Sequence, residues 1–132
     1  MKFFTTDRGV HRLAMPTTMS ELSHAKGMDG FKPLGPSLVT KDECPEPLDV
    51  GIQTKMNGEI RQDARTTELI HSVARCIHEI TKFMTMDPGD VILTGSPSGG
   101  GVASGTFLKP GDVVKMTAEK ISTIRSEVVA AS

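Results

Sequence analysis

The strongest structural signal in this sequence is the segment Ile52-Gln53-Thr54-Lys55-Met56-Asn57-Gly58-Glu59-Ile60-Arg61-Gln62-Asp63. Its central pair, Asn57-Gly58, supplies the two positive φ angles that a type I′ turn between antiparallel strands requires. The segment therefore predicts a β-hairpin, and we expect the rest of the chain to add strands to it.

Further strands are expected on both sides of the hairpin. Short runs rich in apolar and β-branched residues, which are typical of strands, occur at residues 37–40, 91–94, 113–116 and 121–129. Two similar turn sequences precede two of these runs, Asp87-Pro88-Gly89-Asp90 and Lys109-Pro110-Gly111-Asp112. Their likeness predicts one turn chemistry used twice.

One substantial amphipathic helix is expected after the hairpin. Thr66 or Thr67 can cap its N-terminus, and the turn that starts at Asp87 ends it. At about 100° per residue its apolar side chains share one stripe, which predicts packing against the sheet. The stripe consists of Leu69, Ile70, Val73, Ile77, Ile80 and Met84, and the accessible side chains are His71, Arg75, His78 and Lys82. We expect Ile77→Asp to abolish folding, because it places a charge in the stripe.

Length and composition indicate one soluble domain, residues 1–132. The chain has a mass of 14.1 kDa, with 37% hydrophobic and 23% charged residues, which is an ordinary globular composition. Residues 1–23 show no sustained period and are expected to be irregular. The formal net charge of −1 leaves no field to attract a phosphate backbone or an anionic membrane, so neither nucleic acid nor a membrane is an expected partner.

A cytoplasmic location is favoured. No stretch approaches the roughly 20 apolar residues that cross a bilayer, and the N-terminal residues turn polar too early for a signal peptide. Cys44 and Cys76 form no CxxC pair, which fits a reducing compartment and gives no support to a zinc site. We interpret Cys76 as a small core side chain.

A glycine-rich loop follows the strand expected at residues 91–94. In Gly95-Ser96-Pro97-Ser98-Gly99-Gly100-Gly101 small side chains would let backbone N–H groups approach a ligand. No Lys-Ser/Thr pair follows these glycines, so a nucleotide phosphate loop is not indicated. His71 and His78 do not have the i, i+4 spacing of a helical zinc pair and are interpreted as a solvated face.

A series of short phrases runs in order along roughly residues 24–129. They are Lys26-Gly27-Met28-Asp29-Gly30-Phe31, Pro33-Leu34-Gly35-Pro36, Leu38-Val39-Thr40, Asn57-Gly58, Gln62-Asp63, Phe83-Met84, Pro88-Gly89-Asp90-Val91-Ile92-Leu93-Thr94-Gly95 and Lys109-Pro110-Gly111-Asp112-Val113. Together they resemble the C-terminal part of the fumarylacetoacetate hydrolase family. The resemblance implies an α+β, mainly β fold. This is a mixed β roll with one packed amphipathic helix, incomplete at the N-terminus, and commonly a homodimer.

The resemblance also implies a chemistry. Members of that family act on β-dicarbonyl or 2-oxo acids with a divalent metal, Mg²⁺, Mn²⁺ or Ca²⁺, which stabilises an enolate as a Lewis acid. The implied enzyme is a hydrolase, lyase or isomerase of aromatic-compound catabolism with a small oxo acid as substrate.

Three residues take a role from the resemblance. Lys26 would be catalytic and substrate-binding, holding an ammonium group near the developing enolate. Gly95 and Ser96 match a Gly-Thr pair that holds the substrate carboxylate. The Glu-x-Glu and Asp that ligate the family's metal are unmatched, and Phe4 takes the aspartate's place when Arg8 is aligned. No metal ligand is therefore assigned.

Two functions of different classes stay open. The first is a metal-dependent hydrolase, lyase or isomerase of which this chain is the C-terminal portion. The second is a non-catalytic remnant or assembly partner that keeps the fold without the metal carboxylates. The unmatched acidic residues favour the second for the chain acting alone.

Overall fold

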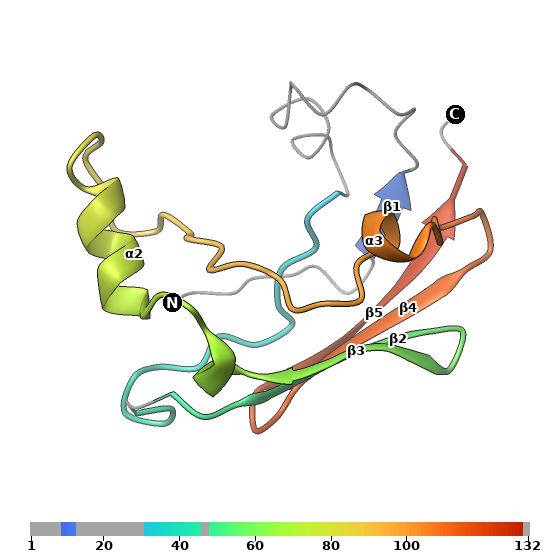
Figure 1. Cartoon of the computed structure of the whole chain (residues 1–132), viewed down its shortest axis with the longest axis horizontal. Coiled ribbons are helices and arrows are strands. Elements are labelled where there is room, and N and C mark those ends of the chain that lie inside the picture. The colour runs from blue at the N-terminus through green and yellow to red at the C-terminus, as the bar shows by residue number, and fades with distance from the viewer. Residues whose placement is uncertain (1–8, 13–30, 46–47, 131–132) are drawn as a thin grey trace.

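The computed structural model describes residues 9–12, 31–45 and 48–130, and it is built on one mixed sheet (Figure 1). The strands in this part of the chain are β1 (Gly9–Arg12), β2 (Gly51–Met56), β3 (Glu59–Arg65), β4 (Val113–Ala118) and β5 (Ser122–Val129). Their order across the sheet is β1-β5-β4-β2-β3. β1 runs parallel to β5, and the other neighbours are antiparallel.

The predicted hairpin is confirmed as β2 and β3. Asn57 and Gly58 at its tip have φ angles of 52° and 91°, as a type I′ turn requires. The Asn57 amide also fixes the tip to the start of β4. Its Nδ2 donates to the Asp112 carboxylate at 2.9 Å, and its Oδ1 accepts from the Val113 N–H at 2.8 Å.

The two proline–glycine turns share one hydrogen-bond pattern, as predicted. The Asp87 N–H donates to the Asp90 carboxylate at 2.8 Å, and the Lys109 N–H donates to the Asp112 carboxylate at 2.7 Å. Each turn places its glycine at positive φ, 114° for Gly89 and 91° for Gly111. In both turns the last aspartate therefore satisfies the first backbone N–H.

Three sequence expectations about strands are wrong. The apolar and β-branched runs at residues 37–40 and 91–94 form no strand. Such a run forms a strand only where a partner strand lies beside it to pair with. β1 is a short strand within the region expected to be irregular. Four residues are too few for a readable period, and β1 is defined by its parallel register with β5 instead.

The expected long helix is also shorter than predicted. A 3₁₀ turn covers Thr66–Glu68, and α2 spans only Val73–Ile80, with Ser72 as its N-cap. The Thr66 hydroxyl does not cap a helix, because it accepts from the Val50 N–H at 2.9 Å and donates to the Leu48 carbonyl at 2.8 Å. Thr66 thus joins the end of β3 to the residues before β2.

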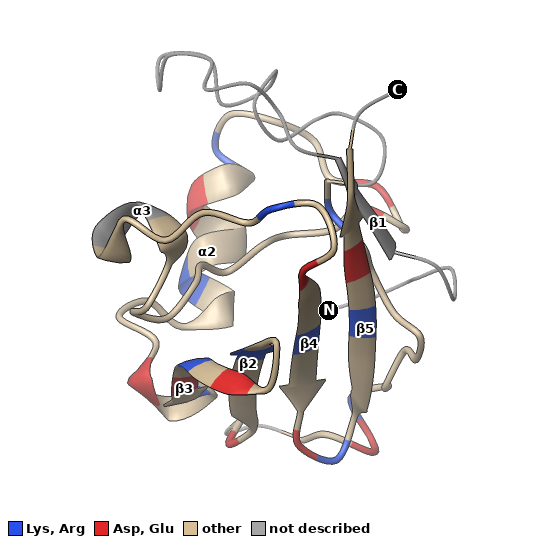
Figure 2. Ribbon diagram, turned by 90° about the vertical axis from the view of Figure 1, so that its right-hand side faces the viewer, with Lys and Arg blue, Asp and Glu red and all other residues tan. Residues whose placement is uncertain are grey.

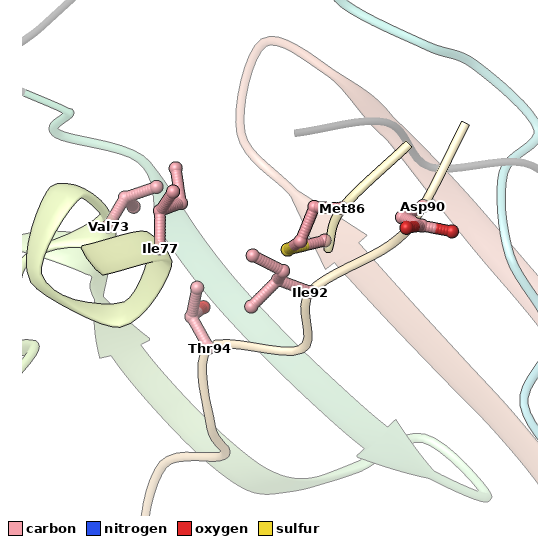
Figure 3. A pocket seen from close by; sticks show the side chains of 6 residues that line it. All are labelled: Val73, Ile77, Met86, Asp90, Ile92 and Thr94. Atoms are coloured by element: carbon pink, nitrogen blue, oxygen red, sulfur yellow. The ribbon is translucent and has the colours of Figure 1, made fainter. Parts of the chain in front are cut away.

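The apolar stripe of α2 does not lie buried against the sheet, so that prediction is wrong. No residue of α2 is buried, and Ile77 keeps 44% of its surface exposed. Figure 1 shows α2 to one side of the sheet. Val73 and Ile77 instead line a cavity of about 240 Å³ together with Met86 and Ile92, which belong to the segment that follows α2 (Figure 3). The expected accessible side chains, His71, Arg75, His78 and Lys82, are exposed.

The core lies on the sheet. Val50, Val114 and Val128 are the buried hydrophobic side chains among the described residues, and Ser126 is buried beside them. Charges of both signs follow one another along β5, where Arg125 and Glu127 lie (Figure 2). In the part that the structure describes, no helix is long and apolar enough to cross a membrane. The predicted class, a mainly β mixed fold with a helix, is confirmed.

Candidate functional site

A cavity of about 550 Å³ lies between the sheet, the start of α2 and the loop that follows residue 92. Its floor is one face of the sheet. Ile52 of β2 pairs with Ala64 of β3 on one side and with Ala118 of β4 on the other. Apolar side chains line most of the rest, namely Leu48, Val50, Leu69, Ile70, Val73, Leu93 and Ile121. Such a lining suits the hydrocarbon part of a small ligand.

The polar edge of the cavity is formed by the loop that carries Gly95 and Ser96, the two residues expected to bind a carboxylate. Gly95 has a φ of 122°, a conformation that only glycine adopts without strain. The Ser96 hydroxyl is exposed and accepts a hydrogen bond from Gln62 Nε2 at 3.1 Å. The structure thus places both residues at the mouth of an apolar cavity.

Two contacts with β3 hold this loop. Gln62 Nε2 donates to the Pro97 carbonyl at 2.8 Å as well as to Ser96. Gly99, at a φ of 94°, lies so close to β3 that an added Cβ would collide with the Arg61 carbonyl oxygen. The close approach expected of the glycine-rich loop is therefore made to protein backbone at this position.

β3 is irregular at the point of contact. Thr54 pairs with Gln62 while Lys55 pairs with Ile60, so Arg61 is one extra residue in the strand. This is a β-bulge, a feature that bends an edge strand and changes the direction of its groups. It presents the Arg61 carbonyl and the Gln62 amide to the loop.

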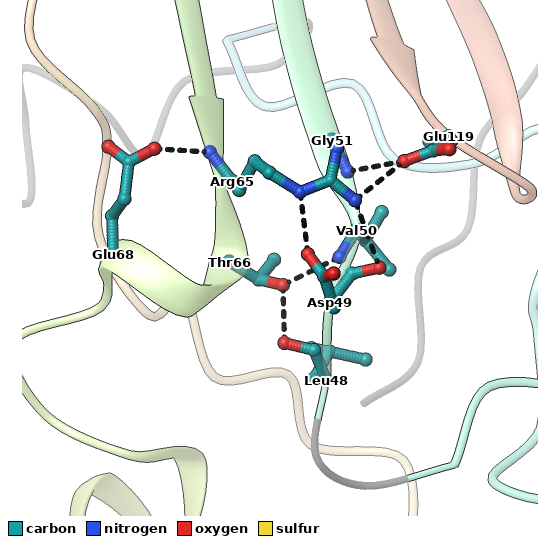
Figure 4. A network of polar contacts seen from close by, with 8 residues as sticks. All are labelled: Leu48, Asp49, Val50, Gly51, Arg65, Thr66, Glu68 and Glu119. Carbon is teal, nitrogen blue, oxygen red and sulfur yellow. Dashed lines mark hydrogen bonds and ion pairs between the residues drawn. The ribbon is translucent and has the colours of Figure 1, made fainter.

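A network of exposed charges lies where β2 begins and β3 ends (Figure 4). Arg65 pairs with Asp49 at 2.6 Å and with Glu119 at 3.0 Å. The hydrogen bonds that Arg65 donates to Asp49 and, with a smaller effect, to Glu119 raise the pKa of Arg65. The hydrogen bond from the Gly51 N–H and, next in size, the one from Arg65 lower the pKa of Glu119. Arg65 borders the cavity, but its guanidinium is held by these two carboxylates.

The other candidate residues have varied positions. Lys26, Phe4 and Arg8 lie outside the described residues. His71 is exposed at the edge of the cavity, and Cys76 is a half-buried free thiol in its wall.

Residues 9–12, 31–45 and 48–130 contain no group of three or more His, Cys, Asp or Glu side chains placed to hold a metal ion. These residues do not fit a divalent metal, which needs a cluster of oxygen ligands.

Two residues of the site received no role from the sequence. Gln62 belongs to the Gln62-Asp63 phrase, but its partners are 34 and 35 residues away and cannot be read from spacing. Gly99 belongs to a run of three glycines, and the run alone does not show which one contacts β3. Gly99 differs from the other two glycines because it lies against the Arg61 carbonyl at the bulge in β3.

Comparison with known proteins gives a consistent picture. Residues 5–129 match the family model described as fumarylacetoacetate (FAA) hydrolase C-terminal. The chain is similar to an uncharacterized protein of Staphylococcus haemolyticus strain JCSC1435, with 43% identity over 106 residues. The match covers 79% of this chain and 35% of that protein. The chain thus spans about a third of the length of this relative.

Solved structures of enzymes are similar as well. A fumarylacetoacetate hydrolase of Exiguobacterium antarcticum has 36% identity and a TM-score of 0.74, covering 84% of this chain and 42% of that one. A 2-hydroxyhepta-2,4-diene-1,7-dioate isomerase of Mycobacterium marinum has 34% identity and a TM-score of 0.67, covering 85% and 44%. A maleylpyruvate hydrolase of Sphingobium sp. SYK-6, solved with manganese(II) and pyruvate, has 28% identity and a TM-score of 0.70, covering 79% and 38%.

Proposed function

The chain belongs to the fumarylacetoacetate hydrolase family, and we propose that it forms the carboxylate-binding side of a site for 2-oxo or β-dicarbonyl acids. The reaction would be hydrolysis, decarboxylation or isomerisation through an enolate. The observation that carries the proposal is the Ser96 hydroxyl, which Gln62 holds at the mouth of the apolar cavity.

The chemistry of such a substrate matches this arrangement. A 2-oxo acid brings a carboxylate, which accepts hydrogen bonds, and a carbon chain, which is apolar in most acyl derivatives. The Ser96 hydroxyl and the neighbouring backbone N–H groups are neutral donors suited to the carboxylate, while the cavity of about 550 Å³ has room for the chain. We therefore favour acylpyruvate-like substrates over compact ones such as oxaloacetate.

Lys26 has a separate place in the proposal. Its ammonium group would lie where the enolate develops and would stabilise that charge in the transition state. A divalent metal such as Mg²⁺ or Mn²⁺ would add Lewis-acid stabilisation of the enolate. The manganese(II) ion in the maleylpyruvate hydrolase structure supports this part of the proposal. The ligands of a metal in this chain would lie outside the described residues, because those contain no acidic cluster.

Binding is tested on the full chain by titrating pyruvate and acetylpyruvate, with Mg²⁺ present, while the amide signals of Gly95, Ser96 and Ser98 are followed by NMR. We expect shifts confined to this loop and the cavity. Ser96→Ala should weaken binding by about 10- to 150-fold, the worth of one hydrogen bond to a charged group at about 1.5 to 3 kcal/mol. Ser104→Ala is the matched control, because Ser104 is an exposed serine of α3 (Gly101–Ser104) and not part of the cavity lining.

Turnover of the same compounds with Mg²⁺ or Mn²⁺ then separates the two functions. For an enzyme, Lys26→Met should lower kcat with little change in KM, whereas Ser96→Ala should mainly raise KM. Binding without turnover would identify a non-catalytic assembly partner. Absence of binding in the wild-type chain would overturn the proposed site.

A further inference from the structure

We propose that Gln62 is a positioning residue that fixes the polarity of the Ser96 hydroxyl, so that the hydroxyl donates its proton to the carboxylate of the ligand. The inference rests on the proposed function, because it assumes that Ser96 meets a carboxylate. It adds a residue of β3, far from the loop in sequence, to the binding site.

The orientation of the Gln62 amide follows from its partner Pro97. A proline carbonyl can only accept hydrogen bonds, so the group that lies 2.8 Å from the Pro97 oxygen has to be the amide nitrogen. The nitrogen carries two protons, and the second one is directed to Ser96 Oγ at 3.1 Å. Ser96 Oγ is therefore an acceptor toward Gln62.

The proton of Ser96 itself is then available to a ligand, because the hydrogen bond that it makes within the described residues is long. Within the described residues the Ser96 hydroxyl donates to the Pro97 carbonyl oxygen at 3.4 Å. That oxygen already accepts the shorter hydrogen bond from Gln62 Nε2. A bond of 3.4 Å between two oxygens is beyond the usual range of 2.5 to 3.0 Å for O–H···O. A carboxylate at the mouth of the cavity would accept this proton, whereas a group that only donates would not.

The backbone around Gln62 supports this role. The bulge at Arg61 places one extra residue in β3 just before Gln62, and the Arg61 carbonyl lies against Gly99. The loop is thus contacted on both sides of Pro97, by the amide on one side and by backbone on the other. This arrangement keeps Ser96 within reach of Gln62.

A double-mutant cycle on the full chain tests the inference, with pyruvate affinity measured by NMR titration of the amides of Gly95, Ser98 and Gly99. Gln62→Met removes both hydrogen bonds at nearly constant volume. We expect it to raise the Kd for pyruvate by about 3- to 10-fold in the wild-type background, and by less than about 1.5-fold when combined with Ser96→Ala. Once the hydroxyl is gone, Gln62 has no proton left to orient.

The matched control is Gln53→Met. Gln53 lies on β2 of the same hairpin and donates to the Asp63 carboxylate at 2.9 Å. We expect this variant to leave the Kd for pyruvate unchanged. If Gln62→Met shows no cooperative thermal transition, Gln62→Asn is measured instead, because its amide ends one methylene short of Ser96 and should give the same cycle.

Two results would overturn the inference alone. An equal loss of affinity from Gln62→Met in both backgrounds would mean that Gln62 only supports the loop through Pro97, and no loss in either would remove it from the site. A wild-type chain that binds neither pyruvate nor acetylpyruvate, or binding that is insensitive to Ser96→Ala, would instead overturn the proposed function, and the inference with it.

Discussion

The sheet and the segment of residues 69–108 use their apolar residues in opposite ways. On the sheet Val114 and Val128, and just before β2 Val50, have 7% or less of their surface exposed. In the segment, by contrast, Ile70 is 93% exposed, Phe83 88% and Phe107 64%. The sheet is held by contacts between distant residues, whereas the segment, apart from the loop that Gln62 of β3 holds, takes its form from contacts between near neighbours.

The helix α2 illustrates the local kind of order. Ser72 caps its first turn by accepting from the Arg75 N–H at 3.2 Å. Glu79 pairs with Arg75 at 2.7 Å and with Lys82 at 2.8 Å. A helix of this length is marginal on such interactions alone, and most helical stability in proteins comes from packing of the apolar face. The difference between the two regions is therefore a difference in cooperativity, and it can be tested.

The largest effect is expected from a charge placed in the sheet. Val128→Asp puts a carboxylate at a position that is 1% exposed, at a cost of about 3 to 5 kcal/mol in free energy of unfolding. Ile77→Asp introduces the same charge at 44% exposure in α2 and should cost about 1 kcal/mol or less. Urea unfolding followed by circular dichroism measures both.

The control for Val128 is its neighbour on β5. Val129 is 38% exposed, and Val129→Asp should behave like Ile77→Asp. If Ile77→Asp instead abolishes the transition, the helix stripe is buried in solution as the sequence predicted, and the contrast between the two regions disappears.

A second prediction concerns the junction of the two regions, where the loop meets β3. Gly99→Ala would drive a Cβ into the Arg61 carbonyl at a φ of 94°. We expect it to release the loop from β3 at a cost of about 1 to 3 kcal/mol, the range for strain at a special backbone position. Hydrogen exchange of the amides of Ser96, Ser98 and residue 99 should accelerate, while amides of β4 and β5 keep their protection.

Gly100 offers a matched control one residue away. Its φ is −62°, and an added Cβ would meet nothing within 4 Å. Gly100→Ala should therefore leave both exchange and stability unchanged. Equal effects from the two substitutions would show that the loop does not rest on the bulge at Arg61.

Much of the fold could be predicted where the signal is local. The Asn57-Gly58 turn and the two Pro-Gly-Asp turns are determined by backbone φ and by neighbouring donors, and all three form as expected. The run at residues 91–94 has strand-like side chains, yet whether it pairs depends on a partner strand. Local propensity carries no information about that partner.

The candidate site divides in the same way. Gly95 and Ser96 could be singled out because they are adjacent in a phrase, and the structure brings them to one cavity mouth. Gln62 reaches the same loop from 34 residues away through a bulge in β3. The hairpin sequence does not show that Arg61 is an extra residue in β3, so this part of the site could be found only from the three-dimensional structure.

The smallest effect is expected from pH, and it should appear in the sheet. The Gly51 N–H and then Arg65 hold the pKa of Glu119 below its usual value of 4.5. A carboxylate whose pKa is lower in the folded state contributes stability above its unfolded pKa and loses it as the pH falls through the folded value. The urea midpoint should thus be level from pH 7 to about 5.5 and decline below about pH 4.5.

Glu119→Gln should lower the midpoint at pH 7 and make the acid decline shallower, whereas Glu127→Gln on β5, outside this network, should leave the slope as it is. An unchanged slope in Glu119→Gln would mean that the Arg65 network does not join the ends of β2, β3 and β4 in solution. Because these charges are exposed, about 0.5 M NaCl should reduce the difference between the two variants by screening.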